Sequence, residues 1–94
     1  MQIKWLSDAI SDVIEIKTYI AHDKPKTAQD IAKRIKQTVN LLKNNPNMGR
    51  VGRILNTREL IVSDTSYIVS YMVKGDVVEI LRVLHGAMNS RIDF

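Results

Sequence analysis

The chain has 94 residues, with 14 lysines and arginines against 10 aspartates and glutamates, and no cysteine. This length fits one domain, residues 1–94. The lack of cysteine excludes disulfides, zinc–thiolate sites and thiol catalysis. The formal charge of +4 favours nucleic acid, an acidic protein segment or an anionic membrane surface as a partner, without choosing among them. No apolar run approaches the roughly 20 residues that span a bilayer, so we expect a cytoplasmic protein with no membrane contact.

The first residues predict a short strand followed by a helix. Residues 2–6 alternate between apolar and polar side chains, which is typical of an edge strand. Apolar residues then recur at spacings of three and four, which predicts a helix to about Ala21. The hydroxyl of Ser7 is the expected cap of its N-terminus.

A second helix follows a break of only a few residues. At this break Asp23 is a candidate cap, and Pro25 is tolerated in the first helical turn because its missing N–H has no partner there. The apolar stripe then continues to Leu42 and ends at the turn residues 44–47. Two helices joined by so short a connection lie antiparallel as a hairpin.

After Pro46 the apolar period changes from 3.6 to 2. Runs rich in Val, Ile and Tyr predict strands at about 51–55, 58–63, 67–73 and 77–84, separated by connections short enough for hairpins. The sequence therefore predicts an α+β domain, in which a short N-terminal strand and an antiparallel helical hairpin pack on one face of a small twisted antiparallel β-sheet. The other face would remain partly open for a ligand.

Several segments, in this order, resemble the RelE/ParE superfamily of bacterial toxins from type II toxin–antitoxin modules. The segments are IKW, TYIA, NNPNMGRVGR, TREL, YIVSYMV and VEILRVLHG. The resemblance implies the same helical hairpin on a small antiparallel sheet. It also implies a cognate antitoxin protein as partner, in a toxin–antitoxin hetero-oligomer.

The resemblance implies one of two activities. RelE-like toxins cut mRNA in the ribosomal A site, whereas ParE-like toxins inhibit DNA gyrase without nuclease activity. We expect a ribosome-dependent mRNA endonuclease that inhibits translation without a metal or cofactor, with ribosome and mRNA as partners. The alternatives are a gyrase inhibitor and a member that only binds.

Cleavage of RNA by its own 2′-OH needs proton transfer and positive charge at the phosphate. Arginine supplies only charge, because it stays protonated, whereas histidine transfers protons near neutral pH. Arg58 and Arg82 are therefore candidates for binding the phosphate and, with His85, form the expected catalytic set. Arg50 and Arg53 would add phosphate-binding charge.

Two acidic groups of the second half are weaker candidates for proton transfer, Glu59 and Tyr71. Glu59 is also a possible structural partner for Arg82 in an internal salt bridge. The arginines near the glycines could equally be solvated strand charges that keep an edge from aggregating.

The alternation of a regular strand separates the last two catalytic candidates. Residues two apart share a face, so Arg82 would lie with Val78 and Ile80, and His85 with Val83. Only a bulge or a turn at Gly86 would bring His85 to the face of Arg82.

The C-terminal residues favour the alternative activity. RelE-like chains often end in HRxDVY, whereas this chain reads HGAMNSRIDF and has no tyrosine after Tyr71. The sequence from His85 to Asn89 is closer to the His-x-x-Met-Asp ending of ParE-type toxins. We expect the tail from about Ala87 to be mobile, since it is polar.

Overall fold

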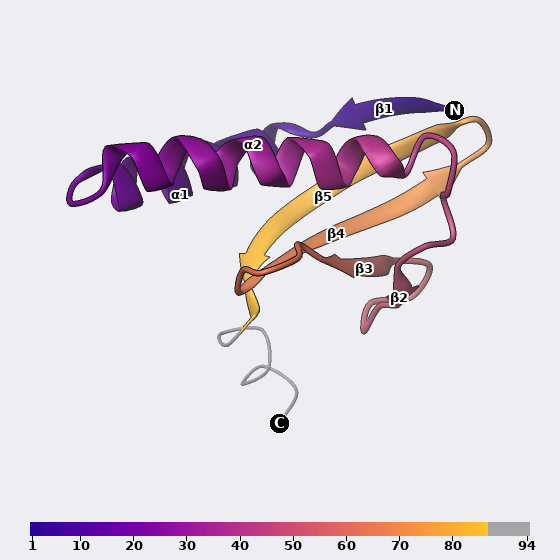
Figure 1. Cartoon of the computed structure of the whole chain (residues 1–94). Coiled ribbons are helices and arrows are strands. Elements are labelled where there is room, and N and C mark those ends of the chain that lie inside the picture. The colour runs from indigo at the N-terminus through magenta and orange to yellow at the C-terminus, as the bar shows by residue number, and fades with distance from the viewer. Residues whose placement is uncertain (87–94) are drawn as a thin grey trace.

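The computed structural model describes residues 1–86, and the predictions for the C-terminal tail concern residues outside this range (Figure 1). Within residues 1–86, two helices and five strands follow one another. The elements are β1 (Gln2–Trp5), α1 (Ser7–Ala21), α2 (Pro25–Leu41), β2 (Arg50–Val51), β3 (Arg58–Ile61), β4 (Tyr67–Lys74) and β5 (Val77–His85). The α+β class is confirmed, and Figure 1 shows both helices on the same side of the sheet.

The five strands form one sheet in the order β1-β5-β4-β3-β2. β2 to β5 make the predicted antiparallel meander. β1 is an edge strand, as predicted, but it pairs parallel with β5, from Gln2 opposite Val77 to Trp5 opposite Ile80. The sheet as a whole is therefore mixed rather than antiparallel, because the long connection through the helices lets the chain return in the direction in which it began.

The helical hairpin is antiparallel, as predicted, but its ends differ from the prediction. Ser7 is already the first residue of α1, and neither helix has a side-chain cap, so the predicted caps at Ser7 and Asp23 are wrong. The amide of Leu6 still donates to the carbonyl of Ile80, 3.0 Å away, so the helix begins directly where pairing with β5 ends. Pro25 is the first residue of α2, as predicted.

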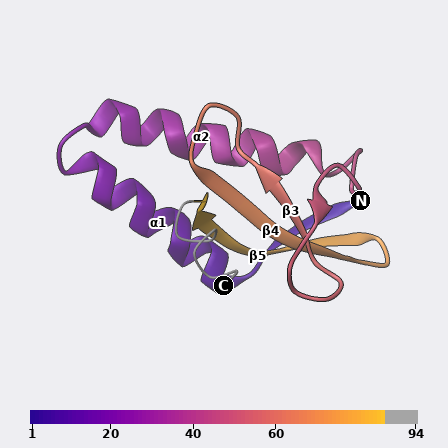
Figure 2. The same cartoon turned by 90° about the horizontal axis from the view of Figure 1, so that it is seen from below.

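The core lies between the helices and the sheet. In the view from below, α1 and α2 diverge from their connection, and the strands are seen in front of the space between the two helices (Figure 2). Ten buried residues from both helices, from β4 and β5, and from the positions just after α2 and β3 form one apolar cluster: Ala9, Ile35, Val39, Leu42, Val62, Val69, Tyr71, Val78, Ile80 and Val83.

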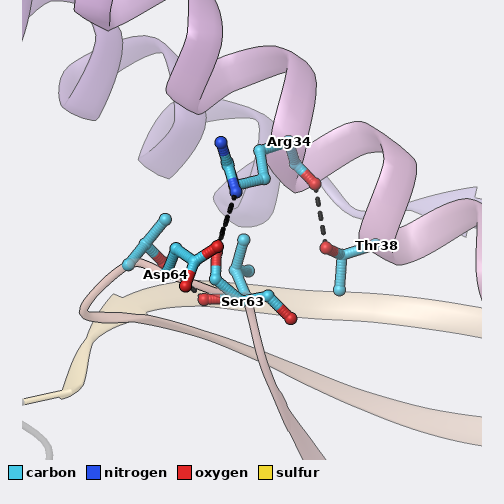
Figure 3. A network of polar contacts seen from close by, with 6 residues as sticks. Arg34, Thr38, Ser63 and Asp64 are labelled. Carbon is cyan, nitrogen blue, oxygen red and sulfur yellow. Dashed lines mark hydrogen bonds and ion pairs between the residues drawn. The ribbon is translucent and has the colours of Figure 1, made fainter.

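A polar contact ties α2 to the turn between β3 and β4. Nη1 of Arg34 lies 3.3 Å from the carboxylate of Asp64 and donates over 3.4 Å to the carbonyl of Ser63 (Figure 3). The hydroxyl of Thr38 donates to the carbonyl of Arg34 one turn away, over 2.9 Å. Both charged groups are largely exposed, so this contact orients the turn more than it stabilises the fold.

β2 has only two residues, so the predicted strand at 51–55 is wrong beyond Val51. The chain leaves the sheet because the amide of Gly52 donates to the carbonyl of Thr57 over 2.8 Å, and the hydroxyl of Thr57 donates to the carbonyl of Ile54 over 2.6 Å. These bonds close a tight turn. β3 likewise ends at Ile61 rather than at residue 63, since a turn closed by Thr65 follows.

Candidate functional site

A bulge in β5 decides which residues face the helices. Ser70 pairs with Arg82, but the next residue, Tyr71, pairs with Ile80, so Leu81 has no partner in β4. Val78, Ile80 and Val83 are accordingly all buried in the core. We call their side of the sheet the helix face, and the side that carries Ser70 and Arg82 the open face.

The bulge corrects the predicted alternation in part. Arg82 does not share a face with Val78 and Ile80, because the extra residue shifts the phase between them. His85 does share a face with Val83, as predicted, since pairing is regular from Arg82 onward. Arg82 and His85 therefore point to opposite faces of the sheet.

Arg82 is held by Asp12 of α1. Its Nε and Nη2 donate to the two carboxylate oxygens over 2.7 and 3.0 Å, and the backbone amide of Val83 donates to the same carboxylate over 2.9 Å. β1 ends level with Ile80, so α1 supplies the partners of β5 beyond that point. The hydrogen bond to Asp12 raises the pKa of Arg82 above its ordinary value, which keeps the guanidinium charged. Glu59 is not its partner.

Glu59 instead lies in a row of residues that crosses the open face. This row consists of Arg50 on β2, Glu59 on β3, Ser70 on β4 and Arg82 on β5, each beside the next across the sheet. Nη2 of Arg50 lies 3.2 Å from the Glu59 carboxylate, which also accepts the backbone N–H of Arg53 over 3.5 Å. The open face thus carries two ion pairs in one line, with the hydroxyl of Ser70 between them.

Arg58 lies on the helix face, opposite Tyr71 of β4. Its Nη1 donates to the carbonyl of Gly49 over 2.7 Å. The Tyr71 hydroxyl accepts the amide of Gly49 over 2.9 Å and donates to the carbonyl of Pro46 over 2.8 Å. Burial raises the pKa of Tyr71, an effect opposed by the Gly49 hydrogen bond and by the charge of Arg58. These two side chains hold the connection between α2 and β2 against the sheet.

His85 lies at the end of β5, against the ring of Tyr67. The ring centroids are 5.5 Å apart and the rings meet edge to face. Both line a shallow groove of about 290 Å³, whose wall includes Asp12 and Tyr19 of α1. Burial, and secondly the neighbouring Tyr19, raise the pKa of Tyr67, so its hydroxyl stays protonated near neutral pH.

The structure places the three predicted catalytic residues in three separate contacts. Arg58 binds the connection before β2, Arg82 binds Asp12 of α1, and His85 packs on Tyr67. Arg58 and His85 share the helix face, but their partners in β4 are four residues apart, which is about 13 Å along a strand.

Sequence reasoning missed Asp12, which lies 70 positions from Arg82. A carboxylate within the apolar stripe of α1 was the available signal, since a buried charge needs a partner. In residues 1–86 no three His, Asp or Glu side chains gather as a metal site would require. Within the same range no helix has the length and hydropathy needed to cross a membrane.

Comparison with known proteins places this fold in a family. The model of the family described as ParE toxin of type II toxin-antitoxin system, parDE, matches residues 3–90. Y4kP of Sinorhizobium fredii, a protein designated a toxin, is 42% identical over 84 residues, covering 89% of this chain and 86% of Y4kP. Toxin RelE2 of Caulobacter vibrioides is 34% identical over 86 residues, covering 92% of this chain and 96% of RelE2.

A solved structure shares the fold. The chain matches a chain of the chromosomal ParDE toxin–antitoxin system from P. aeruginosa with a TM-score of 0.84 and 25% identity, covering 90% of this chain and 95% of that chain. The order of elements, the family model and the relatives agree. The chain therefore belongs to the ParE toxin family of the RelE/ParE superfamily and is a toxin of a type II toxin–antitoxin system.

Proposed function

We propose that this toxin acts by binding and inhibiting DNA gyrase and does not cleave RNA. The observation that carries the proposal is the separation of Arg58, Arg82 and His85 into three contacts on two faces of the sheet. A general acid or base has to lie within hydrogen-bond reach of the proton it transfers. Inhibition by binding needs only a shaped and charged surface, which the ion pairs of the open face and the basic β2 to β3 region provide.

The order of our expectations from sequence is thereby reversed. No bulge lies between Arg82 and His85, so His85 stays on the helix face, away from the row that contains Arg50 and Arg82. The match to the ParE toxin family supports the same choice, because ParE-like toxins are the gyrase inhibitors of the superfamily.

The second candidate function is ribosome-dependent mRNA cleavage, which the relative named RelE2 favours. In that case Arg50, Arg53, Arg58 and Arg82 would bind phosphates, and His85 would transfer the proton after leaving Tyr67. This function would make the chain an mRNA endonuclease that needs neither metal nor cofactor.

A cognate antitoxin protein would hold the toxin inactive in a hetero-oligomer under either function. The ParDE system from P. aeruginosa, whose toxin fold this chain shares, supports this partner. Co-expression with the antitoxin should restore growth and should give one complex on size-exclusion chromatography.

Two purified assays test the proposal. Added to gyrase and supercoiled DNA, the toxin should block supercoiling or accumulate cleaved DNA. Added to a translation extract with a defined message, it should create no new 5′ ends on ribosome-bound mRNA. New 5′ ends together with unaffected gyrase would overturn the proposal in favour of RNA cleavage.

The variant His85→Gln separates the two functions in cells. It removes the proton-transfer group, so it should abolish toxicity if RNA is cut and should preserve it if gyrase is bound. His22→Gln is the matched control, since His22 lies in the connection between the helices. Equal amounts of protein, checked by immunoblot, make the comparison valid.

A further inference from the structure

The segment 48–55, which includes β2 and the first half of the turn to β3, exposes four large apolar side chains. We call this segment the apolar turn: Met48, before β2, is 52% exposed, Val51, in β2, is 79% exposed, and Ile54 and Leu55, in the turn itself, are 72% and 84% exposed. Scattered exposed apolar residues are ordinary on protein surfaces, but a contiguous group marks a site of interaction. The core does not need these side chains, since the buried cluster contains none of them.

The apolar turn is held in one shape by hydrogen bonds at both ends. Gly49 is bound by Tyr71 and Arg58, and the amide of Gly52 donates to the carbonyl of Thr57. Asn56 completes the turn with φ of 68°, in the left-handed region that asparagine tolerates. Apolar side chains on a rigid segment lose little conformational entropy on binding, so the segment is preorganised as an interface.

The charges around the apolar turn are mostly positive. Residues 47–63 contain three arginines, Arg50, Arg53 and Arg58, against a single acidic residue, Glu59. Glu59 pairs with Arg50, so the segment keeps a net positive charge. Methionine and arginine are enriched at protein interfaces, and arginine is enriched among the residues that contribute most to binding.

This composition selects among possible partners. Single-stranded RNA is bound by aromatic side chains on which bases stack, and residues 47–57 contain none. A second copy of the chain would bring like-charged arginines together across the contact, which costs free energy. A protein surface with an apolar pocket edged by carboxylates fits both the side chains and the charge.

We infer that the apolar turn is the element with which the toxin docks on its target protein, by inserting Ile54 and Leu55 into an apolar pocket edged by carboxylates. The inference rests on the proposed function in one respect only, that the target is a protein. It gives this turn a role distinct from that of the row of ion pairs on the open face.

The test is the double variant Ile54→Ser/Leu55→Ser, which removes apolar surface and leaves every charge in place. Its control is Ile14→Ser, which changes another exposed apolar residue, 59% exposed, on α1. The amount of toxin needed to halve growth should rise at least tenfold for the double variant and should stay within twofold for the control. Unchanged toxicity of the double variant would overturn the inference.

Three further measurements on the purified proteins identify the cause. Thermal unfolding and affinity for the cognate antitoxin should stay unchanged, and retention on an immobilised RNA oligonucleotide should stay within twofold. A selective loss of antitoxin affinity would show that the turn serves the antitoxin, and loss of RNA retention would show that it serves RNA. Each of these results would overturn the inference.

Purified gyrase separates this inference from the proposed function. If the wild-type toxin binds gyrase, the double variant should bind at least tenfold more weakly, whereas equal binding would refute the docking role. If the wild-type toxin leaves gyrase unaffected, the proposed function fails, and the growth comparison with its three controls still decides whether the apolar turn docks on the target protein.

Discussion

Asp12 binds Arg82 and the amide of Val83 with one carboxylate, and so joins the first helix to the last strand. This contact places the guanidinium at one end of the charged row on the open face. It also satisfies a backbone N–H that β1 is too short to reach. Asp12 is thus a positioning residue for Arg82 as well as a structural one.

Asp12→Asn should lower the free energy of unfolding by about 1.5–3 kcal/mol. The hydrogen bonds to a charged carboxylate become weaker bonds to a neutral amide, and the NH₂ group of the new side chain faces an N–H donor of Arg82 or Val83. Asp64→Asn is the matched control. It removes the same charge from an exposed ion pair with Arg34 and should cost no more than about 0.5 kcal/mol. Urea unfolding of the three proteins checks both values. Equal costs at the two sites would contradict the structural role of Asp12.

Tyr71→Phe should destabilise the protein by about 1–3 kcal/mol. The variant leaves the amide of Gly49 and the carbonyl of Pro46 without their partner, while the ring still fills the core. Amide hydrogen exchange at Gly49 should become faster than in the wild type. Tyr19→Phe removes a hydroxyl from an exposed ring and should change neither quantity.

Stability should fall in alkaline solution because burial raises the pKa of Tyr67 and Tyr71 in the folded protein. The unfolded chain releases these protons first, near its ordinary pKa of about 10. The folded state then binds more protons, so the free energy of unfolding falls as pH rises through the folded pKa, by up to about 1.4 kcal/mol per pH unit for each tyrosine. Urea unfolding between pH 8 and 11.5 should show a smaller fall for Tyr71→Phe. An identical fall would refute the contribution of Tyr71.

Gly75→Ala should cost about 1–2 kcal/mol. Gly75 closes the hairpin between β4 and β5 with φ of 57°, and a Cβ atom there would meet no other atom within 4 Å. The cost is therefore one of backbone conformation alone. Gly75→Asn should cost less, since asparagine tolerates this region. Thermal unfolding of the two variants checks the order.

Much of the fold could be predicted because each segment repeats a simple pattern. The apolar stripes of the helices and the turn residues between strands placed most elements correctly. The parallel pairing of β1 could not be found in this way, because short strands alternate in the same manner whichever neighbour they choose. The cap at Ser7 was misplaced because the amide of Leu6 still pairs with Ile80, a contact between distant parts of the chain.

The site was less predictable than the fold. Apolar residues stand on both sides of Glu79 and of Arg82 in VVEILRVLH, so the pattern could not reveal the unpaired Leu81 that changes the phase of β5. The opposition of Arg82 and His85 was nevertheless expected and is confirmed, because the strand is regular between them. The sequence suggested Glu59 as the partner of Arg82, and Asp12, 70 positions away, could be found only from the tertiary structure.

The pairing of β1 with β5 has a consequence for how the toxin is made. It joins Gln2 to Val77, so the sheet closes a loop of about 75 residues, for which the chain entropy cost is about 4 kcal/mol. Strand β5 also lies between β1 and β4, so the sheet is divided until β5 has been synthesised. A nascent chain therefore acquires its charged row only once translation has passed Arg82.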